Sequence, residues 1–134
     1  MNAGEKDYRG HGPLPQILII AAAAIFLVTL AYPRLHASLL YLPVDPAINN
    51  YYDSREIPAG QLGGLRDRAG QAIEVHEHHR YQDGLSLLYF LSASDSTSPL
   101  FQRRAHFEQS ITAAEASLDR APSQPRTWLR IAQA

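Results

Sequence analysis

The chain has 134 residues, with 12 basic and 13 acidic side chains and a formal net charge of −1, so it has no basic surface typical of nucleic-acid binding. It contains no cysteine, which excludes disulfides and thiolate metal sites. Apolar residues gather in one run near the N-terminus, so the remaining soluble part is smaller than the length indicates. We therefore expect no nucleic-acid partner and no cofactor.

The first predicted element is a transmembrane helix over residues 14–32, LPQILIIAAAAIFLVTLAY, which has no charged side chain. Such a helix is about 28 Å long, close to the ~30 Å hydrocarbon thickness of a bilayer. The apolar stretch is longer than the ~7 to 15 residues of a signal peptide, which favours a retained anchor over a cleaved signal. The lipid bilayer is thus an expected partner of this segment.

The orientation of the predicted anchor follows from the basic residues around it. Lys6 and Arg9 precede the span, whereas only Arg34 follows it closely. The positive-inside rule then predicts a cytoplasmic tail over residues 1–13 and a C-terminal part on the other side of the membrane. In a Gram-negative cell, this is a single-pass inner-membrane protein with a periplasmic domain.

Residues 33–57 are predicted to form an extended connector. Three prolines and the pair Asn49-Asn50 interrupt this segment, and it has neither a helical nor an alternating apolar period. We expect it to tether the following domain to the anchor, with its tyrosines covering part of that domain.

Residues 58–134 are predicted to form a small domain of four helices, which makes the expected fold all-α. The first helix runs from Pro58 to about Tyr81, where QDG supplies a break. One stripe of this helix carries residues spaced by three and four positions, namely Leu62, Leu65, Ala69, Ala72, His76 and His79. The next segment, LSLLYFLSAS, is apolar nearly all round, and we expect its Leu87, Leu88, Phe90 and Leu91 in the core.

The last two predicted helices follow a serine-rich loop. Ser98 is the expected N-cap of a helix that ends near Arg120. Its stripe is the clearest in the chain and consists of Leu100, Arg104, Phe107, Ile111, Ala114, Leu118 and Ala121. A final helix begins near Pro125 and offers Trp128, Leu129, Ile131 and Ala132 for packing.

The junction SLDRAPSQPRTWLRIA, residues 117–132, resembles the join between two tetratricopeptide repeats. The positions compatible with that family's pattern are Ser117, Pro122, Trp128, Ile131 and Ala132. The resemblance implies one helix pair followed by a helix that opens the next pair or caps the domain, with the indole of Trp128 filling a groove between helices. A standard repeat of about 34 residues would begin at Ser94, inside a loop, so the pattern is irregular.

A histidine-rich segment, EVHEHHRYQD, is the only candidate for metal chemistry. Glu74, His76, His78 and His79 would share helical faces and could supply nitrogen and oxygen ligands. Their order differs from His-Glu-x-x-His, because the second histidine comes one position early. The alternatives are a pH-sensitive surface and a partly exposed helix end without a ligand, and we favour the last.

No sequence pattern indicates catalysis. GQLGG, residues 60–64, lacks the Lys-Ser/Thr ending of a phosphate loop, and no Gly-x-Ser-x-Gly elbow occurs. We expect a membrane-anchored interaction module that is not an enzyme. Its partner would be another envelope or membrane protein, and an oligomer also fits. Phe107, Ile111, Leu118 and Trp128 are its expected structural contacts.

Two other functions stay open. The chain could be a small accessory subunit of a membrane complex, whose span packs through the small residues 21–24. It could also be a metal-responsive domain that uses the histidines.

Overall fold

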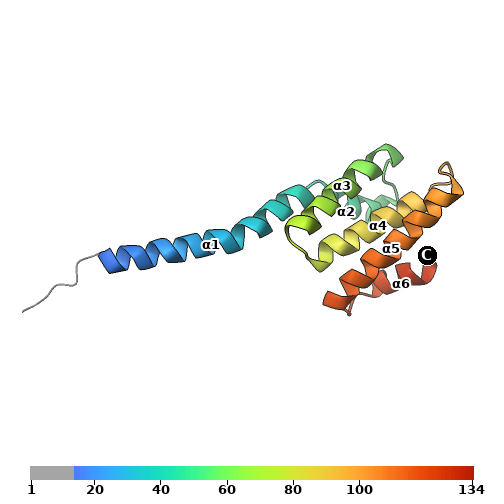
Figure 1. Ribbon diagram of the computed structural model, residues 1–134. Coiled ribbons are helices and arrows are strands. Elements are labelled where there is room, and N and C mark those ends of the chain that lie inside the picture. Colours follow the sequence, from blue (N-terminus) through green and yellow to red (C-terminus); the bar gives the residue numbers. More distant parts are fainter. Residues whose placement is uncertain (1–13) are drawn as a thin grey trace, which may run out of the picture. The chain divides into compact units, whose positions relative to one another are not determined.

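The structure is a computed structural model that describes residues 14–134 (Figure 1). Every regular element in this range is an α-helix, as predicted. The helices are α1 (Leu14–Tyr41), α2 (Val44–Ser54), α3 (Ala59–Val75), α4 (His79–Ser94), α5 (Leu100–Arg120) and α6 (Pro125–Gln133). The described chain divides into two units between Tyr32 and Pro33. The predicted cytoplasmic tail lies outside the described residues.

The first unit is the N-terminal part of α1. Its side chains from Gln16 to Tyr32 are all exposed, and the candidate membrane span Gln16–Tyr41 has a mean hydropathy of 2.1. The hydroxyl of Thr29 donates to the carbonyls of Ile25 and Phe26 at 3.0 and 2.8 Å, so its polarity is satisfied within the helix, as a bilayer requires. This helix is therefore long and apolar enough to cross a membrane, although a signal sequence near the N-terminus has the same character.

The extended connector predicted for residues 33–57 is wrong, because most of this segment is helical. α1 continues through Pro33 to Tyr41, and α2 follows after a short turn. Pro46 lies in the first turn of α2, where backbone N–H groups have no partner within the helix and a proline costs little. Pro43 and Pro46 therefore mark the start of α2, and Pro33 lies inside α1, so none of these prolines excludes a helix.

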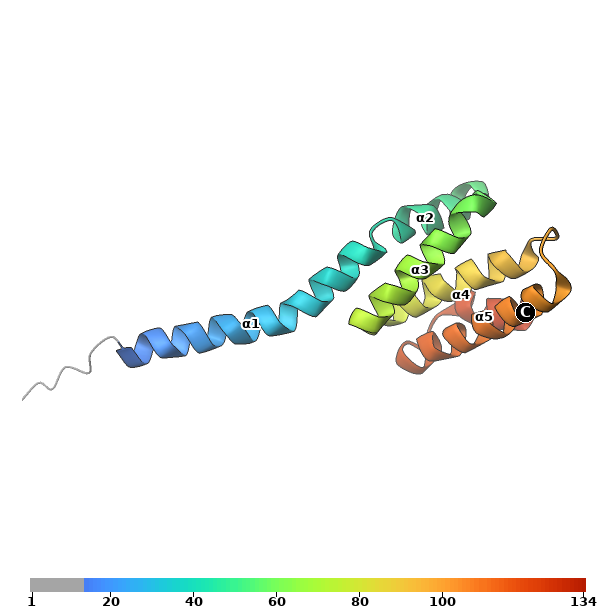
Figure 2. The same cartoon turned by 45° about the horizontal axis from the view of Figure 1, so that its top comes forward.

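The second unit, Pro33–Ala134, has an apolar core formed by the end of α1 with α2, α3 and α4 (Figure 2). Its buried members are Ala37, Tyr41, Val44, Leu62, Leu65, Ala69, Ala72, Tyr81 and Leu88. The predicted stripe from Leu62 to Ala72 is confirmed as a buried face of α3. Tyr41 completes the core, because its hydroxyl donates to the Arg80 carbonyl at 3.2 Å and its ring centre lies 4.6 Å from that of Tyr81.

The predicted helix through Tyr81 is interrupted earlier than expected. α3 ends at Val75, and α4 starts at His79 after the extended residues His76 and His78. The Nδ1 atom of His78 accepts the backbone N–H of Arg80 at 3.2 Å and thereby caps α4. A side chain that can accept a hydrogen bond thus makes the break that we had assigned to QDG.

Gly84 of QDG lies inside α4 and serves close packing. A Cβ atom built there would overlap the hydroxyl oxygen of Tyr41 and approach Cδ1 of Ile48 to 2.9 Å. Only a residue without a side chain lets α4 approach this tyrosine.

α4 also packs against α5, through small polar residues. The hydroxyl of Ser86 donates to the Ser110 carbonyl at 2.8 Å, and the hydroxyl of Ser110 donates to the Ser86 carbonyl at 2.9 Å. Both serines are fully buried. Leu87 and Leu88 are buried as predicted, whereas Phe90 and Leu91, also expected in the core, are half-buried.

The bounds of α5 agree with the prediction, but its start differs in detail. Pro99 precedes the helix and no side chain caps it, so the expected cap by Ser98 is wrong. On the predicted stripe, Ala114 and Leu118 are buried, whereas Leu100 and Arg104 are exposed. The stripe is therefore exposed at its N-terminal end, half-buried at Phe107 and Ile111, and fully buried only at Ala114 and Leu118.

Candidate functional site

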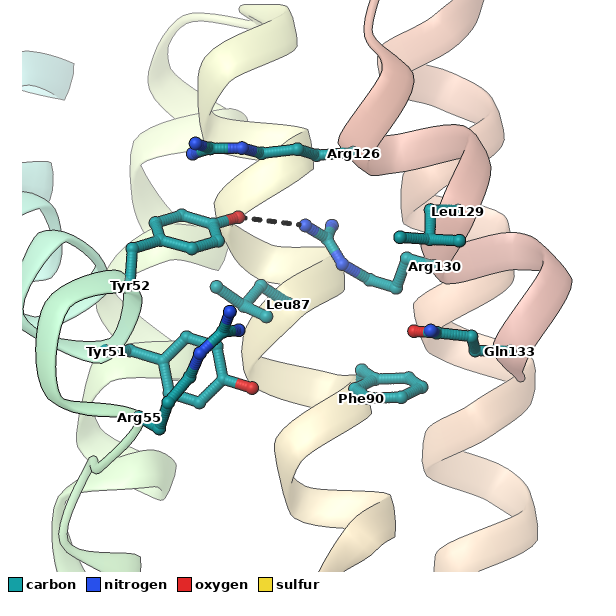
Figure 3. Close-up of a pocket in the computed structure, with 9 residues that line it drawn as sticks. All are labelled: Tyr51, Tyr52, Arg55, Leu87, Phe90, Arg126, Leu129, Arg130 and Gln133. Atoms are coloured by element: carbon teal, nitrogen blue, oxygen red, sulfur yellow. Dashed lines mark hydrogen bonds between the residues drawn. The ribbon is translucent and has the colours of Figure 1, made fainter.

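The candidate site is a pocket of about 290 Å³ that α2, α4 and α6 form together (Figure 3). Its lining consists of Tyr51, Tyr52, Arg55, Leu87, Phe90, Arg126, Leu129, Arg130 and Gln133. Three arginines and two tyrosines thus surround it, with an apolar wall from α4 and α6. We call it the arginine–tyrosine pocket.

Arg130 is the structural centre of the pocket and is only 5% exposed. Its Nη1 atom donates to both Oδ1 and the backbone carbonyl of Asp83, each at 3.0 Å. The hydroxyl of Thr127, also buried, donates to the same Oδ1 at 2.6 Å. A buried guanidinium is stable only when it is paired in this way. Asp83 of α4 therefore anchors α6 through polar contacts.

Tyr52 of α2 connects the buried charge with the open part of the pocket. The Nη2 atom of Arg130 donates to its hydroxyl oxygen at 3.4 Å (Figure 3). The guanidinium of Arg126 lies over its ring, 4.4 Å from the centroid. This distance is in the range of a cation–π interaction, which holds Arg126 above the ring.

The charge of the pocket is not balanced. Asp83 compensates Arg130, but neither Arg55 nor Arg126 forms an ion pair with any residue in the range 14–134. None of the described residues that line the pocket carries a carboxylate. The site can therefore attract and hold a negatively charged group.

Arg55 has an unusual backbone conformation. It follows α2 with φ at 63° and ψ at 18°, and its N–H donates to the Tyr51 carbonyl at 2.8 Å. Glycine is the usual residue at this left-handed position, and another residue costs roughly 1 kcal/mol there. Its guanidinium carbon lies 5.9 Å from the ring centre of Tyr51, which places the cation at the pocket.

The histidine segment does not form the helical ligand face that the sequence indicated. Glu74 is exposed on the last turn of α3, and the three histidines occupy the turn and the start of α4. The rings of His78 and His79 lie 4.3 Å apart, but Nδ1 of His78 is already used as the helix cap. Among residues 14–134, no group of three or more such side chains has a geometry that could hold a metal ion.

The environment of this turn changes the ionisation of His78. Burial, followed by the neighbouring His79, His76, Arg80 and Arg120, lowers the pKa of His78 below its ordinary value. The neutral imidazole, which can accept a hydrogen bond, is thus favoured at the cap.

The residues expected from the tetratricopeptide resemblance, and those expected as structural contacts, lie in different surroundings. Ser117 and Leu118 are buried, and the hydroxyl of Ser117 donates to the His79 carbonyl at 2.9 Å. Half-buried positions are Phe107, Ile111 and Ile131, and exposed ones are Pro122, Trp128 and Ala132. Phe107 meets Phe90 edge to face at 5.9 Å.

Trp128 does not fill a groove between helices, as we had expected. Its side chain is 55% exposed, and the indole N–H donates to the Pro122 carbonyl at 2.9 Å. Thr127 and Arg130 occupy the buried face of α6 because both bind Asp83.

The arginines of the pocket were not predicted from the sequence. Arg126 and Arg130 are four positions apart on α6, so one face of a short helix carries two cations. Together with Tyr51-Tyr52, this spacing was the available signal. Comparisons with protein-family models, with curated proteins and with solved structures found no match for this chain.

Proposed function

We propose that this protein is a membrane-anchored interaction module whose helical domain binds a segment of another protein. The observation that carries the proposal is the arginine–tyrosine pocket, which is open and holds uncompensated charge. Arginine and tyrosine are also the residue types that most often dominate binding energy at protein interfaces.

The anchor in this proposal is the apolar part of α1. It is retained in the bilayer, and the helical domain lies on the periplasmic side, following the distribution of basic residues around the span. Anchoring confines the domain to the membrane surface and raises the local concentration of a partner held there. A weak pocket can therefore support stable association.

The domain would act in the way of a short helical repeat. α4 and α5 form the helix pair, and α6 covers part of α5 in the position of a capping helix. The tetratricopeptide likeness is part of this proposal.

Photo-crosslinking in native membranes tests the proposed binding. A photoreactive amino acid replaces Gln133, at the rim of the pocket, in the full chain, and a matched variant carries it at the exposed Arg68 of α3. We expect a discrete protein adduct from position 133 and none from position 68. Equal adducts from both positions, or none from position 133, would overturn the proposal.

The same membranes test the anchor. We expect the full-length chain to resist alkaline carbonate extraction. A shortened, extractable product that begins after the apolar run would instead identify a cleaved signal.

A second candidate function is an accessory subunit that assembles through its span. The supporting observation is that Ala21, Ala22, Ala23 and Ala24 are all exposed in the first unit, where small residues allow close helix approach. If the protein assembles through its span, replacing Ala21 and Ala24 with leucine would abolish assembly. If it binds through the pocket, the same replacement would leave the adduct from position 133 unchanged.

A further inference from the structure

We infer that the arginine–tyrosine pocket recognises an acidic peptide segment in which a carboxylate lies next to an apolar side chain. This inference rests on the proposed function and specifies the chemistry of its partner. It follows from four features of the pocket: the free cations, a free hydroxyl proton, the apolar wall and the backbone of Arg55.

The first feature is the orientation of the charge. Arg126 lies with its guanidinium carbon over the Tyr52 ring, and its side chain forms no hydrogen bond or ion pair with any residue in the range 14–134, so its N–H groups remain available. A guanidinium held in this way can bind both oxygens of a carboxylate, with little further loss of side-chain freedom. Arg55 adds a second cation at the same pocket.

The second feature is the hydroxyl of Tyr52. Arginine has no acceptor atom, so the contact at 3.4 Å makes the tyrosine oxygen the acceptor and leaves its own proton unused. No residue in the range 14–134 accepts that proton. It can therefore donate to an anion that Arg126 holds.

The third feature distinguishes a peptide from a simple anion. Leu87, Phe90 and Leu129 form an apolar wall beside the cations. A bare phosphate or a lipid headgroup leaves this wall in water, whereas an apolar side chain next to a carboxylate covers it. The volume of about 290 Å³ is near the lower limit for ligand pockets, ~300 Å³, and fits one or two side chains.

The fourth feature is that Arg55 occupies a position suited to glycine. The left-handed backbone is unfavourable for a side chain, and no contact of Arg55 with a described carboxylate offsets it. A role for the guanidinium in binding an anion explains why an arginine stands there. Arg55→Gly should then raise the stability of the domain, because glycine adopts the left-handed backbone without strain, and should weaken binding, because the cation is lost.

The test is fluorescence anisotropy with the full chain in a non-ionic detergent. The probe is a fluorescein-labelled peptide, Gly-Ser-Glu-Phe-Glu-Phe-Gly, and its matched control has glutamine in place of both glutamates. We expect the acidic peptide to bind about tenfold more tightly than the control, as expected for hydrogen bonds to a charged group.

Three variants locate the binding. Arg126→Gln should weaken the acidic peptide about tenfold. Arg55→Gly should weaken it as well while raising the melting temperature, and Arg68→Gln, which removes the same charge from the exposed face of α3, should change neither. Equal binding of the two peptides, or no effect of Arg126→Gln, would overturn the inference.

Competition experiments identify the source of the anion. Inorganic phosphate and phosphatidylserine vesicles should displace the peptide only weakly. Displacement by the vesicles that depends on Arg126 would show that the pocket binds lipid and would overturn the peptide assignment. An unchanged crosslink from position 133 in Arg126→Gln would contradict this inference alone, whereas the absence of a position-specific crosslink in the chain that keeps Arg126 would contradict the proposed function.

Discussion

The core beneath α3 and the contacts around α5 and α6 hold the same domain together by different means. Between α1, α2, α3 and α4, buried apolar side chains such as Leu62, Leu65 and Leu88 form the contact. On the other side of α4, apolar residues of α5 such as Ala114 and Leu118 are also buried, but they are joined by the Ser86–Ser110 hydrogen bonds and by a charged network with α6. One helix thus presents an apolar face to one neighbour and adds buried hydrogen-bonding groups towards the others.

This difference has an energetic consequence. Apolar contacts lose stability in proportion to the area that a substitution uncovers. A buried hydrogen-bonded pair instead leaves an unsatisfied partner when one member is removed, and this costs more than the pair contributes. Although α6 is short, a single substitution in its buried polar network should therefore lower the stability of the domain strongly.

The largest expected effect is at Asp83. Asp83→Asn leaves the guanidinium of Arg130 buried without a counter-charge, which should lower the free energy of unfolding by about 3 kcal/mol. Urea unfolding followed by circular dichroism measures this, and hydrogen exchange should show the loss first in α6. The matched change Glu108→Gln affects an exposed Arg104 pair and should cost less than about 0.5 kcal/mol. Similar losses from both variants would show that burial does not set the difference.

The next effect tests the apolar side of α4. Gly84→Ala should destabilise the domain by about 1–3 kcal/mol, because the new methyl group overlaps Tyr41. Adding Tyr41→Phe removes the overlapping oxygen and should restore part of the loss. Gly70→Ala in α3 is the control: its Cβ would meet no atom within 4 Å, and it should stabilise the helix by up to about 1 kcal/mol. Equal melting temperatures for the two alanine variants would contradict the close approach.

A smaller effect is expected at the serine contact. Ser110→Ala removes a donor to the Ser86 carbonyl and should cost about 1 kcal/mol, measured by thermal unfolding. Ser94→Ala changes an exposed serine that bonds only to the Phe90 carbonyl of its own helix, so it should be nearly neutral. If both substitutions were neutral, the α4–α5 contact would depend on shape and not on its hydrogen bonds.

The smallest effect concerns pH. Because the pKa of His78 is lowered in the folded protein, the unfolded chain takes up its proton first as pH falls. The contribution of His78 to stability is therefore present above its ordinary pKa of about 6.5 and is lost as pH falls through the lower folded value. His78→Asn keeps an acceptor at the cap and should flatten this dependence in melting curves between about pH 7.5 and pH 5. An unchanged pH dependence would show that other groups cause it.

The apolar parts of the fold could be predicted from the sequence. The run before Pro33 was predicted from its length and its lack of charge, the stripe of α3 follows the three-to-four spacing of a buried helix face, and α5 has the predicted bounds. The break before α4 was misplaced, because the cap is made by the histidine at position 78, a residue type that sequence rules do not count as a cap.

The candidate site was hidden for a related physical reason. Burial of Thr127 and Arg130 depends on one carboxylate, Asp83, more than 40 positions earlier in the chain. The spacing of apolar residues cannot predict such a distant polar partner. From that spacing, Trp128 was therefore expected to be the buried residue of α6. Because Arg130 and not Trp128 is on the buried face of α6, Arg126 and Arg130 both contact Tyr52 of α2, and these contacts form the pocket.

The position of Trp128 gives the protein an internal optical reporter. The only tryptophan of the chain is exposed on α6, and its indole N–H is tied to the Pro122 carbonyl. Unfolding of α6 would break that bond, so tryptophan emission should shift while the ellipticity of the other helices is still intact. Fluorescence and circular dichroism recorded on one sample would then resolve two transitions, and the interval between them would measure how independently this last helix moves.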